Sequence, residues 1–138
     1  MSEASRENVE TVERGIEAFN EGGIEGIIQF IDPEFVAVTP PELASEPDTY
    51  RGPDGLRRWF DSFYEVMDEI RWEAHRYHEA GDRVIVEFTL RARGKTSGLD
   101  FGQDAVMVWR LRDGKGIRLD LYPTLDEAMA AIERGPAG

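Results

Sequence analysis

The chain has 138 residues, 41% of them hydrophobic and 10% aromatic, and a formal net charge of −12. This composition favours one packed domain, here expected over residues 1–134 with a frayed tail at 135–138, and it excludes a disordered chain. The acidic balance argues against nucleic-acid binding, which needs a basic surface. With no cysteine, two histidines and no long apolar segment or export signal, we expect a cytoplasmic protein without metal, cofactor or membrane partner.

Hydrophobic spacing predicts three helices in the first half of the chain. Val9, Val12, Ile16 and Phe19 recur at intervals of three and four, which indicates a helix over residues 4–21. A shorter helix around residues 27–30 is stopped at Asp32-Pro33. The third helix has Pro53 in its first turn. Its predicted apolar face contains Leu56, Trp59, Phe60, Phe63 and Val66.

Strands account for most of the remaining chain. A short strand over residues 35–39 is closed by Pro40-Pro41, and a loop is expected from there to Gly52. Alternating patterns predict two antiparallel hairpins, the second with Asp113-Gly114 as a strong turn signal. The four strands cover residues 70–79, 83–93, 103–112 and 116–122, and a closing helix covers 124–133. This order predicts an α+β architecture with three helices on one face of the sheet.

Several segments together resemble the SnoaL-like, polyketide cyclase-like proteins of the nuclear transport factor 2-like superfamily, which includes ketosteroid isomerase. The matching segments are AFNEGGIEGIIQFIDPEF, YRGPDGLRRWF, EAGDRVIVEF and VWRLRDGKGIRLDLY followed by DEA. The resemblance implies a cone-shaped fold, with a strongly curved, mostly antiparallel sheet wrapped around N-terminal helices and a central pocket. It also implies a homodimer in many members. Because relatives include isomerases, cyclases, dehydratases, hydrolases and non-enzymatic proteins, the fold alone does not give the function.

The second hairpin decides which side chains face the predicted pocket. If Asp113-Gly114 are the two turn residues, Met107 lies opposite Asp120. One face then holds Ala105, Met107, Trp109, Leu111, Arg118, Asp120 and Tyr122, and the other holds Val106, Val108, Ile117, Leu119 and Leu121. The resemblance places Met107 where the isomerase has its sheet acid, so we expect the Met107 face, with Asp120, to line the cavity. The opposite, apolar face is then expected to form the homodimer contact.

The same resemblance argues against steroid isomerase activity. Thr39 stands at the position of the isomerase's aspartate base, Gly15 at that of its helix-one tyrosine, and Met107 at that of its sheet acid. Neither threonine nor methionine can perform the role of those acids. Many SnoaL-like relatives have a histidine in place of Met107, so this chain differs from them as well.

Candidate catalytic residues are Asp120, Tyr122 and His78. Asp120 would act as general acid or base beside Arg118, and Tyr122 would donate to a ligand carbonyl. The alternatives are a satisfied ion pair for Asp120 and a partly exposed histidine for His78. Candidate ligand-binding residues are Thr39, Trp59, Phe63, Met107, Trp109 and Arg118, although Trp59, Phe63 and Trp109 equally suit an ordinary core.

Two functions follow from this pattern. The first is a pocket protein that binds a small apolar or oxygenated molecule, with cofactor-independent acid or base chemistry of cyclase, isomerase, dehydratase or hydrolase type as one hypothesis. The alternative is a non-catalytic, dimeric association or ligand-binding domain whose pocket is filled by side chains.

Overall fold

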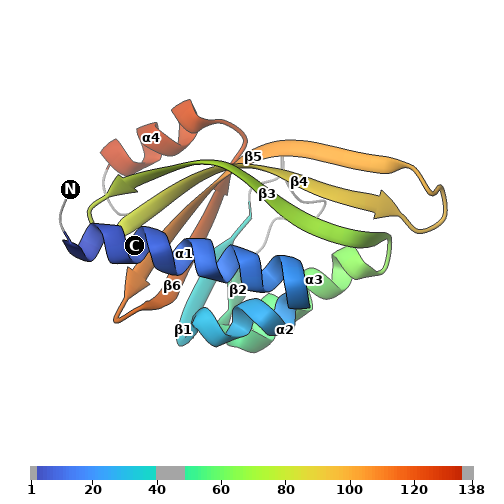
Figure 1. Ribbon diagram of the computed structural model, residues 1–138, viewed down its shortest axis with the longest axis horizontal. Coiled ribbons are helices and arrows are strands. Elements are labelled where there is room, and N and C mark those ends of the chain that lie inside the picture. The colour runs from blue at the N-terminus through green and yellow to red at the C-terminus, as the bar shows by residue number, and fades with distance from the viewer. Residues whose placement is uncertain (1–2, 40–48, 135–138) are drawn as a thin grey trace.

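The computed structural model describes residues 3–39 and 49–134, and Figure 1 shows their arrangement. In chain order, the elements are α1 (Glu3–Gly22), α2 (Ile24–Ile27), a 3₁₀ turn (Ile28–Phe30), β1 (Ile31–Val38), β2 (Thr49–Arg51), α3 (Gly52–Tyr64), β3 (Met67–Ala80), β4 (Arg83–Gly94), β5 (Asp100–Arg112), β6 (Lys115–Tyr122) and α4 (Leu125–Glu133). The predicted tail at 135–138, the strand stop at Pro40-Pro41 and most of the predicted loop lie outside the described residues.

The six strands form one sheet in the order β2-β1-β6-β5-β4-β3. The β1–β6 pair is parallel, and the other pairs are antiparallel. Bulges interrupt β3 twice, and such irregularities increase the bend and twist of a strand. The sheet curls over α1, α2 and α3 without closing, while α4 lies on its opposite face (Figure 1). The predicted cone-shaped α+β fold is therefore confirmed.

Two boundaries in the first half differ from the sequence prediction. β1 begins at Ile31, not at residue 35, and β2 lies inside the predicted loop. Pro33 is accommodated in β1 because pairing with β6 shifts register between Ile31 and Val36, so its missing N–H breaks no regular ladder. Val66 lies beyond the end of α3 and is 57% exposed, so it does not belong to the apolar face of that helix.

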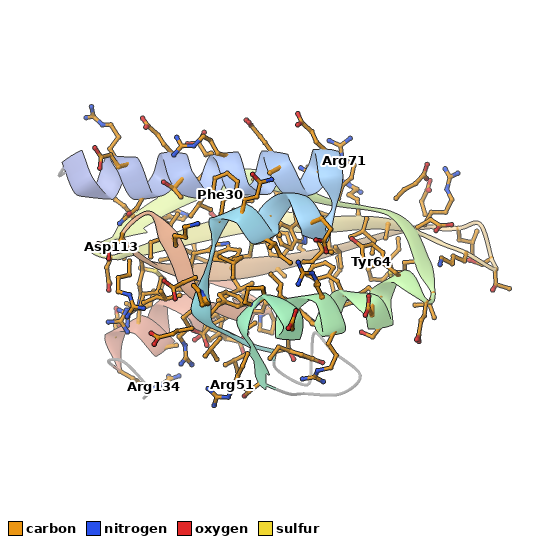
Figure 2. The ribbon with its side chains drawn as sticks, turned by 90° about the horizontal axis from the view of Figure 1, so that it is seen from below. Phe30, Arg51, Tyr64, Arg71, Asp113 and Arg134 are labelled. Atoms are coloured by element: carbon orange, nitrogen blue, oxygen red, sulfur yellow. The ribbon has the colours of Figure 1, made fainter. Side chains whose placement is uncertain are left out.

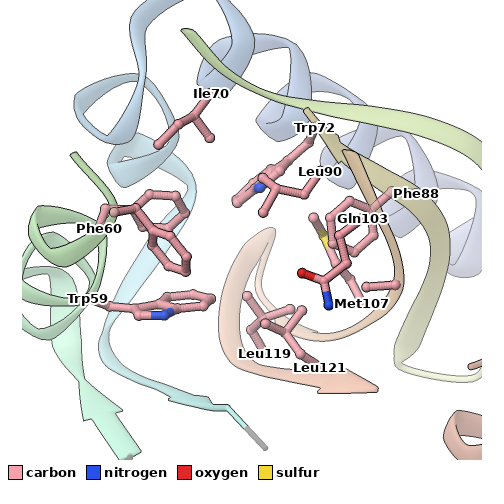
Figure 3. Close-up of a pocket in the computed structure, with 12 residues that line it drawn as sticks. Trp59, Phe60, Ile70, Trp72, Phe88, Leu90, Gln103, Met107, Leu119 and Leu121 are labelled. Carbon is pink, nitrogen blue, oxygen red and sulfur yellow. The ribbon is translucent and has the colours of Figure 1, made fainter. Parts of the chain in front are cut away.

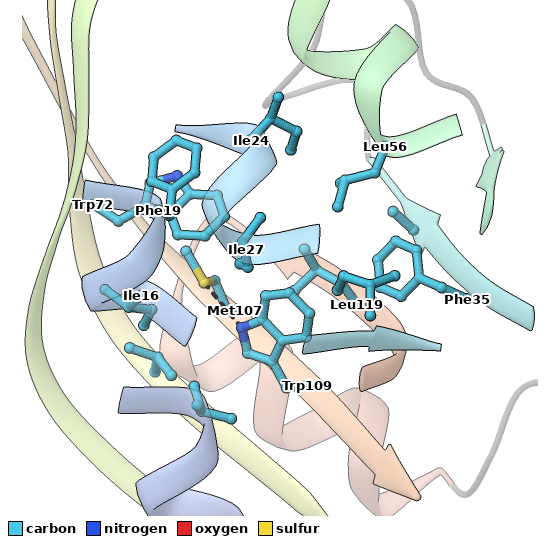
Figure 4. Close-up of a cluster of buried hydrophobic side chains, with 14 of the residues drawn as sticks. Ile16, Phe19, Ile24, Ile27, Phe35, Leu56, Trp72, Met107, Trp109 and Leu119 are labelled. Carbon is cyan, nitrogen blue, oxygen red and sulfur yellow. Dashed lines mark hydrogen bonds between the residues drawn. The ribbon is translucent and has the colours of Figure 1, made fainter. Parts of the chain in front are cut away.

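The main core lies between the concave face of the sheet and the first three helices. From the helix side, α1 and α3 flank a layer of side chains packed onto the strands (Figure 2). Phe19 of α1 stacks on Trp72 of β3 with ring centroids 3.9 Å apart. Figure 4 shows how Ile16, Ile27 and Leu56 enclose the same core. Burial of this apolar surface is the main force that holds the helices against the sheet.

A smaller core lies between the convex face of the sheet and α4. Its buried residues are Ile85, Val106, Val108 and Ala128. The proposed homodimer contact assumed that no helix covers this apolar face, and the structure contradicts that assumption. Val106 and Val108 are each only 4% exposed because α4 packs over them, and Leu119 belongs to the main core. Association of two copies remains a prediction, without the face first given to it.

The register of the β5–β6 hairpin is also different from the prediction. Asp113 and Gly114 form the expected turn, with φ values of 53° and 76°, and Arg112 pairs with Lys115 as predicted. Beyond Gly116 a bulge at Ile117 adds one residue to β6, which moves every later side chain to the other face. Asp120 therefore lies opposite Val108.

The bulge has a clear energetic consequence. It turns Leu119 and Leu121 towards the concave face, and it turns Arg118, Asp120 and Tyr122 towards the convex face. Without the bulge, two charged groups would enter an apolar core, which costs far more than a local irregularity in the sheet. Every predicted site residue on β6 consequently lies on the face opposite to the one expected.

Candidate functional site

An apolar cavity opens between α3 and the concave face of the sheet (Figure 3). It encloses about 520 Å³ of empty space, its open mouth included, of which about 40 Å³ is accessible to the centre of a water molecule. The lining residues come from five elements: Trp59, Phe60 and Phe63 from α3, Ile70 and Trp72 from β3, Phe88 and Leu90 from β4, Gln103, Ala105 and Met107 from β5, and Leu119 and Leu121 from β6.

Local periodicity explains why these side chains converge. Phe60 is one residue and Phe63 four residues after Trp59 on α3, so the three rings share one face of the helix. On β5, Gln103, Ala105 and Met107 alternate in steps of two and therefore point to the same side of the sheet. The curvature of the sheet then brings the helix face and the strand face around one space.

One side chain, that of Gln103, supplies a polar group to this otherwise apolar wall. The carboxamide of Gln103 turns towards the cavity in Figure 3. The indole Nε1 of Trp59 is buried and has no hydrogen-bond partner. Among the described residues that line the cavity, none has an acidic or basic side chain. These walls can hold an apolar ring and offer it hydrogen bonds from Gln103, but they offer no side chain for general acid or base catalysis.

Three of the predicted ligand-binding residues, Trp59, Phe63 and Met107, line the cavity. Trp109 does not: it is packed in the core beside α1, and its Nε1 donates a hydrogen bond to the Met107 sulfur at 3.2 Å (Figure 4). Thr39 follows the end of β1 and is only 3% exposed, and it is not part of the cavity wall.

The predicted catalytic residues lie on the convex face, away from the cavity, but His78 on β3 is separated from Asp120 and Tyr122 on β6 by the two strands β4 and β5. The Arg118 guanidinium donates to both carboxylate oxygens of Asp120, at 2.7 Å from Nε and 3.0 Å from Nη2. This hydrogen bonding raises the pKa of Arg118. Burial raises the pKa of the Tyr122 hydroxyl, and the charge of Asp120 raises it further. His78 Nε2 pairs with Glu87 Oε2 at 2.8 Å.

A hydrogen-bonded network on the convex face involves residues that were not among the predicted site residues. The Thr89 hydroxyl donates to Asp104 Oδ1 at 2.6 Å and also contacts His75 Nε2 at 2.7 Å. Because the Thr89 proton is committed to Asp104, the His75 ring nitrogen is the donor in this network. Each polar group therefore has a partner, as expected for a network that stabilises the sheet.

Sequence reasoning missed several residues of the cavity wall. The sequence could have predicted Gln103, because this residue is four positions before Met107 on the same strand and must share its face. Leu119 and Leu121 were assigned to the wrong face because the bulge at Ile117 has no signal in the alternation pattern. The convergence of β3 and β4 onto the cavity depends on the curvature of the sheet, which no local pattern encodes.

Two classes of site are not found in the part of the chain that the structure describes. Residues 3–39 and 49–134 contain no cluster of histidine and carboxylate side chains suited to hold a metal ion. No helix within these residues is both long enough and apolar enough to span a bilayer.

A curved α+β cone with an apolar cavity under its sheet is the nuclear transport factor 2-like fold. Residues 12–119 match the model of the SnoaL-like domain, and the chain belongs to this family. The family is one of small-molecule binding and cyclase- or isomerase-type proteins. No curated protein sequence matches the chain.

Solved structures agree with this assignment. TerC, co-crystallized with polyporic acid, is 26% identical, with a TM-score of 0.75 over 92% of this chain and 98% of TerC. An NTF2-like protein of unknown function from Burkholderia pseudomallei K96243 is 22% identical, with a TM-score of 0.74 over 94% and 97% of the two chains. A ketosteroid isomerase-like protein from Catenulispora acidiphila DSM 44928, in complex with trimethylamine, is 16% identical, with a TM-score of 0.71 over 88% and 90%. The last two similarities show the fold alone.

Proposed function

We propose that this chain binds a small, ring-containing apolar molecule in the cavity beneath its sheet, and that the described residues lining the cavity bind without acid or base catalysis. The observation that carries the proposal is the composition of the wall. Eleven of its twelve residues are apolar or aromatic, and the twelfth is the neutral Gln103. Ligand pockets typically combine apolar walls with a few placed polar groups in this way.

The aromatic rings of the wall explain why a ring-shaped ligand suits the site. Trp59 and Phe60 from α3 and Trp72 from β3 present large apolar surfaces to one space (Figure 3). Transfer of a flat ring from water to these surfaces removes apolar area from solvent and permits stacked or edge-on aromatic contacts.

Acid or base chemistry, the hypothesis first considered, lacks support from the register. Asp120, Tyr122 and His78 were its candidate residues, and all three belong to the convex side of the sheet. A general acid or base must come within hydrogen-bond reach of the atom that it protonates or deprotonates. These groups lie on the other side of the sheet from a molecule in the cavity.

A titration with indane, a two-ring hydrocarbon, tests the proposal by calorimetry. The variant Ala105→Phe places a ring in the cavity wall, and Ala130→Phe makes the same change on α4, away from the cavity. We expect the wild-type protein and Ala130→Phe to bind indane and Ala105→Phe to lose binding, with circular dichroism confirming that both variants fold. Absence of binding to the wild-type protein, or equal binding by Ala105→Phe, would refute the proposal.

Polyporic acid is the first natural compound to test in the same titration. TerC was co-crystallized with it, and TerC is 26% identical to this chain over 92% of its length. Its binding by the wild-type protein, and its loss in Ala105→Phe, would support an aromatic, oxygenated natural ligand.

A further inference from the structure

Gln103 places a carboxamide between the deep end of the cavity and its open mouth. On the concave face of β5, Met107 is only 1% exposed and Ala105 is 7% exposed. Phe101, two residues before Gln103 and on the same face, is 38% exposed. Gln103 is half-buried between these extremes, and its carboxamide turns into the space that the lining side chains enclose (Figure 3). A ring that fills the deep end therefore meets this carboxamide with its outer edge.

The polar atoms of this carboxamide are not used within the protein. In residues 3–39 and 49–134, no hydrogen bond joins the Gln103 side chain to another group. The next residue, Asp104, shows the contrast, because on the convex face its carboxylate accepts a hydrogen bond from the Thr89 hydroxyl at 2.6 Å. Water can pair with a half-buried amide, but a ring that enters the cavity displaces that water. The ligand must then replace the lost hydrogen bonds, because an unpaired amide in an apolar site weakens binding.

We propose that Gln103 determines the class of ligand, and that it selects ring compounds in which a hydrogen-bond donor stands beside an acceptor, as in a lactam. This inference rests on the proposed binding function and specifies the polar edge of the ligand. A carboxamide has an acceptor oxygen and a donor NH₂ group side by side in one plane. Glutamine uses both groups at once on the donor–acceptor edge of adenine, and a lactam presents the same pair of groups.

A ligand with only one of the two groups leaves half of the carboxamide unpaired. Among the described residues of the wall, Gln103 is the only one with a carboxamide, hydroxyl or charged group, so the ligand alone must match it. A ligand that only accepts pairs with the NH₂ group and leaves the carboxamide oxygen without a donor. A ligand that carries both groups pairs with the amide whichever way the amide plane is turned. Its ring then covers the aromatic side chains of the wall while its polar edge faces the mouth.

Three two-ring compounds of nearly equal size test the inference. Indane has no polar group, 2-indanone has a carbonyl oxygen, and oxindole, a lactam, has the same carbonyl beside an N–H. Calorimetry gives the ratio of the affinity for oxindole to that for 2-indanone. This ratio is expected to be about fivefold higher in the wild-type protein than in Gln103→Met, the effect of one neutral hydrogen bond. Comparing one ratio between two proteins cancels the different hydration of the two ligands.

The matched control is Leu90→Met. Leu90 lies opposite Gln103 on the neighbouring strand β4 and also lines the cavity. The variant introduces the same methionine side chain beside Gln103 and keeps the carboxamide, so it should change both affinities alike and leave their ratio at the wild-type value. Circular dichroism confirms that both variants fold.

The side-chain NH₂ signals give a second readout in the wild-type protein itself. The chain has two glutamines, Gln29 and Gln103, whose NH₂ groups give separate signals in a nitrogen-15 spectrum. Gln29 is exposed and does not belong to the cavity wall. Saturation with oxindole is expected to move the Gln103 signals and to leave those of Gln29 in place. The Gln103→Met spectrum assigns the Gln103 signals by their disappearance.

The outcomes separate this inference from the proposed function. If none of the three compounds binds the wild-type protein, the binding function itself fails, and the inference fails with it. If the compounds bind but the ratio is the same in the wild-type protein and Gln103→Met, the cavity binds rings and Gln103 does not select a donor beside an acceptor. Gln103 signals that stay in place while oxindole binds would show that the carboxamide does not touch the ligand, which overturns the assignment.

Discussion

Replacement of Asp120 by asparagine should reduce stability and leave ligand binding intact. The carboxylate accepts two hydrogen bonds from Arg118 on the convex face, where the Asp120 and Arg118 side chains are 19% and 29% exposed. Asparagine keeps the shape and removes the charge, so Arg118 loses its carboxylate in a partly desolvated place. The cavity is on the other side of the sheet and does not include either residue.

The size of the effect follows from the degree of burial. Exposed ion pairs contribute about 0 to 1 kcal/mol, and breaking a fully buried pair costs about 3–5 kcal/mol. A two-pronged pair that retains about a quarter of its exposure lies between these limits, so we expect Asp120→Asn to lower the free energy of unfolding by about 2 kcal/mol. The control is Glu34→Gln: Glu34 pairs with Arg112 at 2.9 Å, but the two side chains are 77% and 51% exposed, and its loss should cost less than about 1 kcal/mol.

Urea unfolding of the two variants, followed by circular dichroism, measures both free energies. A double-mutant cycle with Arg118→Met isolates the pair energy, which should be positive and smaller at high salt. Indane titration of Asp120→Asn should give the wild-type affinity. Unchanged stability together with lost binding would show that Asp120 faces the cavity and that the bulged register is wrong.

Three further perturbations test other parts of the fold. Burial raises the pKa of Tyr77 to about 12 from its ordinary 10.0, so the unfolded chain loses this proton at a lower pH than the folded chain does. The free energy of unfolding should therefore be retained below pH 10 and fall as the pH rises towards 12. In alkaline unfolding curves, Tyr77→Phe should flatten that fall. In Gly116→Ala the new Cβ would lie 3.2 Å from two ring carbons of Trp109. Thermal unfolding should therefore show a free energy of unfolding lowered by about 1–2 kcal/mol. An unchanged unfolding midpoint would refute the close packing. The Thr124 hydroxyl caps α4 by accepting a hydrogen bond from the Glu127 backbone N–H at 3.2 Å. In urea unfolding, Thr124→Ala should lower the free energy of unfolding by about 1 kcal/mol. An unchanged free energy of unfolding would show that α4 contributes nothing to the convex core.

Much of the fold was predictable because its signals are local. The spacing of Val12, Ile16 and Phe19 predicted α1, whose apolar side then proved to be buried. Asp113-Gly114 predicted the hairpin turn, because both residues must adopt positive φ there and glycine does so without strain. These features depend on a few neighbouring residues, and neighbouring residues are what a sequence displays directly.

The candidate site was only partly predictable for the opposite reason. The two strands of the β5–β6 hairpin have large apolar residues on both faces, so alternation alone does not tell which face is internal. The outcome depends on the bulge at Ile117, which places Leu119 and Leu121 in the main core and leaves Arg118 and Asp120 outside it. That choice is made by the free energy of burial summed over every element packed on the sheet.

The side chain of Trp59 shows the same division. From the sequence, Trp59 is one apolar position on an amphipathic helix, and that prediction is confirmed by its burial. Its unpaired N–H is a property of the whole structure, because it depends on which acceptors the folded chain brings near and which it keeps away. Secondary structure and the apolar faces of the helices were determined by local periodicity, whereas the face of Asp120 and the free donor of Trp59 were decided only when distant strands and helices packed together.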